Sequence, residues 1–278
     1  MRSVLFISVI LLSLQLNTSA QDFHMPQASP TVSVNQGFST SFIKLEYSRP
    51  SMRGRTIFGQ LLPYGDLWRT GANQATKITF GEDVYIDGQE IKAGSYAIYT
   101  IPGENEWTII FNKGTDNWGS SGYKKSEDVL RFNAAVHHPE HTYETFSIRI
   151  ENITNNSCNL VLNWENTKLV IPIEVHNNER IMAYLDKKLK SDKPPYAAAA
   201  DYYLETNQKL DDALKYISMA IKENPKAFHL YWAKAQIYQK LGQHKKAVAA
   251  AKKSAEKAKG SAFEVEYAQH YKHIQTLK

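Results

Sequence analysis

The sequence predicts a multidomain β + α protein, with an antiparallel β-sandwich or jelly-roll-like domain followed by an α-helical hairpin module. Two observations predict it. As far as Val175, short runs that alternate apolar and polar residues are separated by turn residues, as in strands that have one face on a core. From Asn177 onward the apolar residues recur with the period of a helix, so the architecture changes near residue 176.

Residues 1–20 are expected to form a cleaved signal peptide. Arg2 supplies the positive charge, residues 4–16 form a short apolar run, and Ala20 ends a small-residue cleavage site. The run is shorter than the roughly 20 residues that span a bilayer, so we do not expect a transmembrane protein. We expect an exported protein, periplasmic or extracellular, whose residues 21–30 form a flexible N-terminus.

The β-sandwich domain is predicted over residues 31–175. Turn pairs such as Asp87-Gly88 and Pro102-Gly103 separate several of its runs. Many strands without intervening helices indicate a sandwich or jelly-roll. The strands are expected at 31–34, 38–47, 75–80, 84–86, 95–101, 106–112, 129–136, 142–151, 158–164 and 168–175.

The helical part begins with a helix and a proline-containing linker over residues 176–195. Beyond the linker, residues 196–278 repeat with a spacing of 34, and the spacing resembles tetratricopeptide repeats, with a capping helix at 262–277. The resemblance implies a surface that contacts a protein partner. The equivalent positions are Leu204 with Tyr238, Ala213 with Ala247, and Ala220 with Ser254.

Charge and cysteine content exclude several classes of function. The net charge is +5; acidic residues outnumber basic ones in 21–175, and lysines dominate from residue 176. These lysines are spread around helices without a nucleic-acid-binding motif, so we expect no nucleic-acid partner. Cys158 is the only cysteine, which excludes an internal disulfide. The sequence holds no phosphate-binding glycine loop and no nucleophile elbow, so we predict no cofactor.

The connection at 48–73 is the first candidate ligand-binding region. Such a long connection is usually functional or disordered, and its apolar residues argue against disorder. Guanidinium groups match carboxylate or phosphate oxygens, and an indole stacks on planar groups or sugar rings. The alternative is that the arginines hold the connection in place by bonding carbonyls and carboxylates. The candidates are Arg49, Arg53, Arg55, Trp68, Arg69 and Asn73.

Several motifs in and after this connection resemble the domain of unknown function 2911 (DUF2911) family. The resemblance covers about residues 29–175 and implies a secreted bacterial protein, without implying a reaction. The motifs are YSRP at 47–50, RGRTIFG at 53–59, LPYG at 62–65, WRTGAN at 68–73, AT at 75–76, AGSY at 93–96, IPG at 101–103, EWTIIFNK at 106–113 and WG at 118–119.

A second candidate surface surrounds the polar stretch at 113–125. Asn112, Trp118 and Tyr123 lie in or beside it, and aromatic residues in such a loop favour carbohydrate binding. The alternative is that Trp118 anchors the loop. Trp107 and Trp164 fall within strand runs, so we expect them in the core.

His137 and His141 belong to an H-x-x-E-H pattern that occurs in zinc peptidases. That chemistry needs a helix, and Pro139 disfavours one here. The two histidines are therefore weak metal candidates, and a solvated loop is the default expectation.

We therefore expect an exported, non-catalytic binding or scaffold protein. Its β-domain binds a glycan or anionic group, and its repeats contact a protein. One alternative is an enzyme acting on envelope or extracellular polysaccharide, for which Glu104, Glu106 and Asp116 are carboxylates to consider. Another is a purely structural envelope component.

Overall fold

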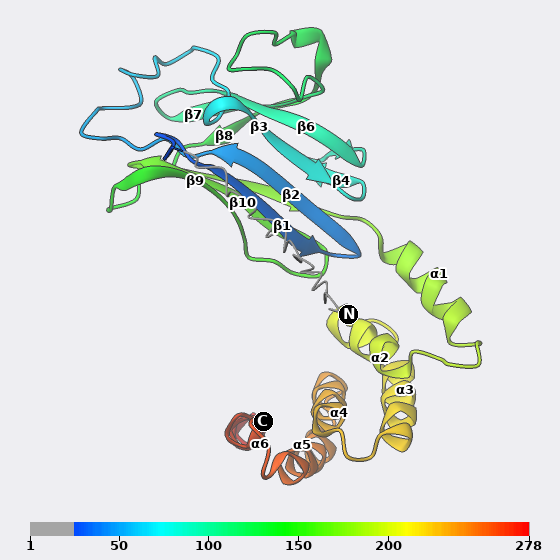
Figure 1. The fold of residues 1–278 in the computed structure, drawn as a ribbon. Helices are drawn as coiled ribbons and strands as arrows, with labels where there is room; N and C mark the ends of the chain where they lie inside the picture. Colours follow the sequence, from blue (N-terminus) through cyan, green and yellow to red (C-terminus); the bar gives the residue numbers. More distant parts are fainter. Residues whose placement is uncertain (1–24, 278) are drawn as a thin grey trace, which may run out of the picture. The chain divides into compact units, whose positions relative to one another are not determined.

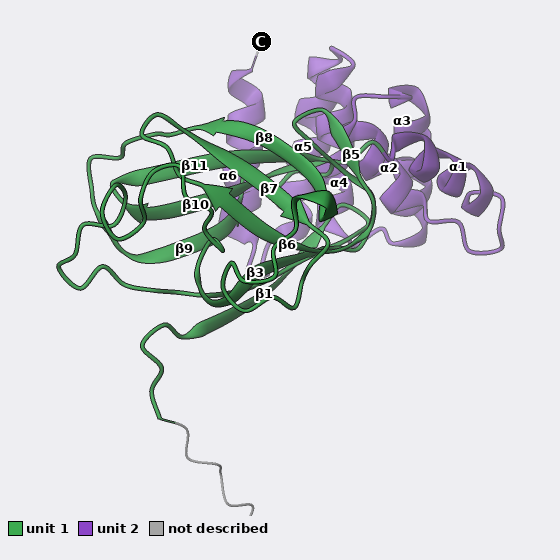
Figure 2. Ribbon diagram, turned by 90° about the horizontal axis from the view of Figure 1, so that it is seen from above, with its two compact units in different colours: residues 1–176 green, residues 177–278 purple. Residues whose placement is uncertain are grey.

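A computed structural model describes residues 25–277 of the chain. It contains two compact units, with the boundary between His176 and Asn177 (Figure 2). The first unit is built of β-strands and the second of helices, as the sequence predicts (Figure 1). The predicted signal peptide, residues 1–20, lies outside the described residues.

The first sheet has six antiparallel strands in the order β1-β2-β3-β6-β7-β8. Its members are β1 (Thr31–Phe38), β2 (Ser41–Ser48), β3 (Ala72–Phe80), β6 (Gly94–Ile101), β7 (Glu106–Asn112) and β8 (Asp128–Ala135). A single turn of 3₁₀ helix, Lys125–Glu127, precedes β8.

The second sheet has five antiparallel strands in the order β5-β4-β11-β10-β9. Its members are β4 (Val84–Ile86), β5 (Gln89–Ile91), β9 (Tyr143–Glu151), β10 (Ser157–Glu165) and β11 (Thr167–Glu174). β5 is not predicted from the sequence, because its three residues include a single apolar side chain and show no alternation.

One predicted strand is divided in the structure. Residues 38–47 were expected to be continuous, but Phe38 ends β1 and a turn at Ser39 and Thr40 leads into β2. Ser39 takes a positive φ of 52°. The turn has neither the glycine nor the asparagine that usually marks such a conformation. The turn residues therefore do not predict this hairpin.

The core lies between the two sheets and includes residues of the connection at 48–73. Ile57, Phe58 and Trp68 of this connection are buried, so the expectation that it is structured is confirmed. Trp107 and Trp164 are also buried, as predicted. The carboxylate of Glu165 accepts hydrogen bonds from the backbone N–H groups of Ile57 (3.3 Å) and Phe58 (3.2 Å).

The helical unit contains six helices within the described residues. They are α1 (Asn178–Lys188), α2 (Tyr196–Glu205), α3 (Leu210–Glu223), α4 (Phe228–Lys240), α5 (His244–Ala258) and α6 (Glu264–Thr276). From α2 to α6 each helix packs against the next. The small residues Ala213, Ala220, Ala247 and Ser254 are all buried, as expected where helices pack closely. Between residues 25 and 277, no helix is both long and apolar enough to cross a membrane.

Cys158 on β10 yields a prediction about chemical reactivity. The residue is 1% exposed, and burial raises the pKa of its thiol from 9.0 to about 11. Because the folded state holds the proton more tightly, this group's contribution to stability is complete below pH 9 and is lost as the pH rises towards 11. At pH 8 we expect the native thiol to react with a disulfide reagent at least about 100-fold more slowly than the urea-unfolded chain. Equal rates would show that β10 does not protect Cys158.

Candidate functional site

Three of the four arginines of the connection bond backbone carbonyls. Arg49 donates from Nε to the carbonyl of Phe146 (2.9 Å). Arg53 donates from Nη2 to the carbonyl of Ala28 (2.9 Å). For these two residues the bonding pattern favours the structural alternative, because each guanidinium already has an acceptor within the fold.

Arg55 bonds its own connection. It donates from Nε to the carbonyl of Met52 (2.9 Å) and from Nη2 to that of Ser51 (2.8 Å). The connection has few ladder hydrogen bonds, so side-chain donors must satisfy its carbonyls. Arg55 therefore stabilises a turn.

Trp68 lies in the core and not at the surface. Its indole is 4% exposed, and Nε1 donates to the carbonyl of Gly71 (3.0 Å). The ring contacts four other aromatic rings at centroid distances of 5.1 to 6.2 Å. They are Phe58, Trp107, Phe146 and Trp164. The ring of Trp68 is thus enclosed by protein and offers no face to a ligand.

Arg69 has a different environment from the other three arginines. Trp68 pairs through its backbone with Thr100 of β6 (2.8 and 2.9 Å), and successive residues of an extended segment point to opposite faces. Because Trp68 and Thr70 are buried in the fold, Arg69 points away from the core. Its Nε is buried without a hydrogen-bond partner, and burial lowers its pKa.

The loop at 113–125 is held at its base by Asn112 and Tyr123. Asn112 is fully buried; its amide donates to the carbonyl of Lys124 (3.0 Å) and to Asp128 (2.8 Å), and its oxygen accepts from the N–H of Gly114 (2.8 Å). The hydroxyl of Tyr123 donates to Asp128 (2.9 Å). Both residues are engaged in shaping the loop.

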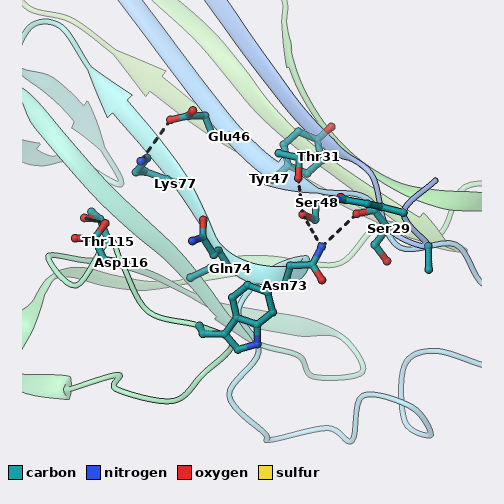
Figure 3. Close-up of a pocket in the computed structure, with 14 residues that line it drawn as sticks. Ser29, Thr31, Glu46, Tyr47, Ser48, Asn73, Gln74, Lys77, Thr115 and Asp116 are labelled. Atoms are coloured by element: carbon teal, nitrogen blue, oxygen red, sulfur yellow. Dashed lines mark hydrogen bonds and ion pairs between the residues drawn. The ribbon is translucent and has the colours of Figure 1, made fainter. Parts of the chain in front are cut away.

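Asn73 and Trp118, the two remaining candidates, line a common cleft of about 550 Å³ (Figure 3). The cleft lies over β2 and β3, where Glu46 and Lys77 are cross-strand neighbours. The 113–125 loop supplies one wall and residues 27–31 supply another. The lining residues are Gln27, Ala28, Ser29, Thr31, Glu46, Tyr47, Ser48, Asn73, Gln74, Ala75, Lys77, Thr115, Asp116 and Trp118.

Asn73 joins the walls of this cleft. Its amide donates to the carbonyl of Ser29 (3.3 Å) and to the hydroxyl of Ser48 (3.1 Å). Its backbone carbonyl accepts from the N–H of Gly119 (3.0 Å). Asn73 has a φ of 60°, a conformation that asparagine tolerates better than most residues. The backbone carbonyls of Ala28, Ser29 and Pro30 thus each accept a hydrogen bond from the β-domain.

Trp118 is the exposed aromatic residue of the cleft. Its side chain is 67% exposed, although its backbone is fixed by a bridge to Gln74 and by the bond between the carbonyl of Asn117 and the N–H of Ala75 (3.1 Å). A rigid backbone that carries a solvent-exposed indole does not fit the alternative in which Trp118 anchors the loop.

The charges inside the cleft are largely compensated. Glu46 forms ion pairs with Lys44 (3.2 Å) and Lys77 (3.5 Å). Burial raises the pKa of Glu46, but the hydrogen bond from Lys44 and the charge of Lys77 outweigh it, so the pKa lies below its ordinary value. Glu46 is therefore a carboxylate at neutral pH and a poor general acid.

The two weak metal candidates lie in an irregular segment and not in a helix. The backbone of His137 pairs with Lys168 of β11, and the ring of His141 packs against Tyr143 at 4.4 Å. Within residues 25–277, no cluster of three or more metal-ligating side chains is found. The segment lacks the helical turn that the peptidase pattern requires.

A second, smaller cleft of about 300 Å³ lies on the helical unit. Its residues are Asp201, Leu204 and Glu205 of α2, with Gln236 and Lys240 of α4. Near this helix pair, Trp232 of α4 stacks on His270 of α6 with centroids 4.4 Å apart.

The first unit is thus a two-sheet antiparallel sandwich with an open polar cleft that carries an exposed tryptophan. Residues 29–173, more than half of the chain, match the model of the family described as protein of unknown function (DUF2911). The chain belongs to this family. No curated protein and no solved structure matches it.

Most of the cleft's polar residues are not predicted from the sequence. Glu46, Gln74 and Lys77 lie on strands where polar residues normally face water, so nothing in the sequence distinguishes them. Thr115 and Asp116 fall inside the predicted loop surface, which is the one signal that could have found them.

Asn112 allows a test of how the cleft wall is held. Asn112→Ala removes three hydrogen bonds from buried groups, which we expect to cost about 1–3 kcal/mol. The variant should unfold at a lower temperature, and trypsin should cut the 113–125 loop faster at Lys113 and Lys124. Asn35→Ala, at an exposed position of β1, is the matched control and should change neither measurement. Unchanged proteolysis in Asn112→Ala would contradict the proposed support.

Proposed function

We propose that the β-domain binds a carbohydrate in the cleft beside Trp118. The observation that carries the proposal is the 67% exposure of Trp118 in the wall of an otherwise polar cleft. An indole has a flat apolar face that can pack on the apolar face of a sugar ring, while nearby polar groups bond its hydroxyls. The cleft's volume falls within the range of about 300 to 1,000 Å³ that is usual for ligand sites.

The polar groups around Trp118 suit a hydroxyl-rich ligand. Gln74 supplies an amide, Asn73 supplies its side-chain oxygen as an acceptor, Thr31 supplies a hydroxyl, and Asp116 supplies a carboxylate. The open form of the cleft favours an extended chain over a compact apolar molecule, which would require a more enclosed and apolar site.

Binding is better supported than hydrolysis. A glycosidase needs a carboxylic acid whose pKa is raised so that it donates a proton near neutral pH. The pKa of Glu46 moves in the opposite direction. The proposed role is therefore recognition, with the polysaccharide-degrading enzyme as the rival and a purely structural role as the outcome if no sugar binds.

The test is a glycan array followed by calorimetry with the chain from Gln21 onward. Trp118→Ala should weaken binding of any selected sugar at least tenfold, about 1.4 kcal/mol, without a change in melting temperature. Tyr64→Ala is the matched control, because Tyr64 is also exposed, at 47%, but does not line the cleft. Equal affinity of both variants and the wild type would contradict the site, and release of shortened sugars would favour the enzyme.

We also propose that α2–α6 are tetratricopeptide-like repeats that contact a protein, and that the chain is exported. The 34-residue spacing and burial of Ala213 and Ala247 support the repeats, and the α2–α4 cleft offers a contact surface. Arg2, the apolar run at 4–16 and the small residues before Gln21 support export to the periplasm or the exterior.

One experiment tests both statements. A photo-crosslinking residue at Gln236, inside the α2–α4 cleft, should capture a partner in the native cells, whereas the same residue at the exposed Lys222 of α3 should not. The captured chain should be recovered from the exported fraction with its N-terminus near Gln21. Equal capture at both positions, or an intact N-terminus in the cytoplasmic fraction, would overturn the respective statement.

A further inference from the structure

Arg69 is an arginine without a partner beside the proposed binding site. Its Nε is buried and bonds nothing. Among residues 25–277, no carboxylate forms an ion pair with it, although Asp66 and Asp116 lie in the adjacent connection and loop. The other arginines of the connection all donate to carbonyls. Among the described residues, the charge of Arg69 therefore has no ion-pair partner.

The position of Arg69 relates it to the cleft. A side-chain carbon added at Gly119 would lie 3.7 Å from Nη1 of Arg69. Gly119 directly follows Trp118, and its N–H bonds the carbonyl of Asn73 (3.0 Å). Nη1 of Arg69 thus lies close to the backbone of the residue that follows Trp118, although Arg69 is not itself among the residues that line the cleft.

Gly119 places no side chain next to the guanidinium. Its φ of 66° lies in the left-handed region that favours glycine. A Cβ at this position would be in van der Waals contact with Nη1. The backbone conformation favours glycine here, so residue 119 places no side chain against Nη1.

We propose that Arg69 binds the carboxylate of an acidic sugar whose ring lies on Trp118. This inference rests on the proposed carbohydrate function and names its substrate class, a uronic-acid-type glycan. A guanidinium bonds a carboxylate through parallel N–H groups, and such charge-assisted bonds are stronger than neutral ones.

The charge balance of the site favours a singly charged group. Lys44 and Lys77 share the single carboxylate of Glu46, Asp116 in the cleft lining supplies a second negative charge, and Arg131 is paired with Asp128. Arg69 therefore contributes one uncompensated positive charge, which a single carboxylate neutralises. A phosphate ester would carry more negative charge than this arrangement compensates.

The proposal also predicts an unusual effect on stability. A partly buried charge without a partner destabilises a fold, because its lost hydration is not replaced. Arg69→Met should therefore melt at the same or a slightly higher temperature than the wild type. Arg49→Met should melt lower, because it leaves the carbonyl of Phe146 without its donor.

The binding test uses trimers of galacturonate, glucuronate and mannuronate, each beside its methyl ester, with inorganic phosphate as a free-anion probe. For the wild type we expect at least one acidic trimer to bind at least tenfold tighter than its ester. Arg69→Met should remove this preference, and Arg69→Lys should keep part of it. Trp118→Ala should weaken acid and ester alike, and Arg55→Met, outside the cleft, should behave as the wild type.

Each other outcome has a separate meaning. If the esters bind as tightly as the acids and Arg69→Met has no effect, the acidic subsite is overturned while the carbohydrate function stands. If phosphate alone competes at the same site as the trimers, Arg69 binds free anions and the sugar-acid assignment fails. If neither acids nor esters bind, both proposals fail, and a lowered melting temperature of Arg69→Met would assign the residue a structural role.

Discussion

The burial of Trp68 is the constraint on which the rest of the β-domain depends. Its indole packs between rings contributed by both sheets and by the connection itself, and its backbone extends β6 through Thr100. Since side chains alternate along an extended segment, an inward Trp68 obliges Arg69 to point outward. Trp68 lies four residues before β3, so its burial also positions the start of β3, where Asn73 lines the cleft. A core contact thus determines which polar groups the outer surface presents.

The arginines of the connection illustrate why composition alone does not identify a binding site. A long segment outside the ladders leaves many carbonyls without partners, and an arginine supplies several donors at once. Arg49 and Arg55 serve this purpose. Arg69 has the same chemistry, but its buried Nε has no hydrogen-bond acceptor. What separates a structural arginine from an available one is the set of surrounding acceptors, which depends on tertiary structure.

The sequence predicts the fold well where periodicity is strong. Alternation locates nearly all the strands, and the helical period locates the second unit, because burial of one face imposes both patterns. The β1–β2 turn and the short β5 are not predicted, because their residues show neither a turn signal nor alternation. In the candidate site, the sequence finds Trp118 and Asn73 but gives Trp68 the same standing as Trp118. Two tryptophans beside glycines look alike until packing makes one 4% and the other 67% exposed. Glu46 and Lys77 resemble any solvent-facing cross-strand pair, and only the walls around them make them part of a cleft.

Asn73 explains how a cleft made of three separate segments keeps its shape. Its side-chain amide donates to Ser29 and to Ser48 of β2. Its backbone carbonyl accepts a hydrogen bond from Gly119, in the loop that carries Trp118. The loop is fixed independently through Asn112, so both ends of the wall are held without a ligand. Ordering of loops on binding subtracts from affinity, and that cost is small here because the backbone is already bonded. The exposed indole on this wall is apolar surface that folding leaves in contact with water. A ligand with a flat apolar face would cover this surface, and removing it from water favours binding.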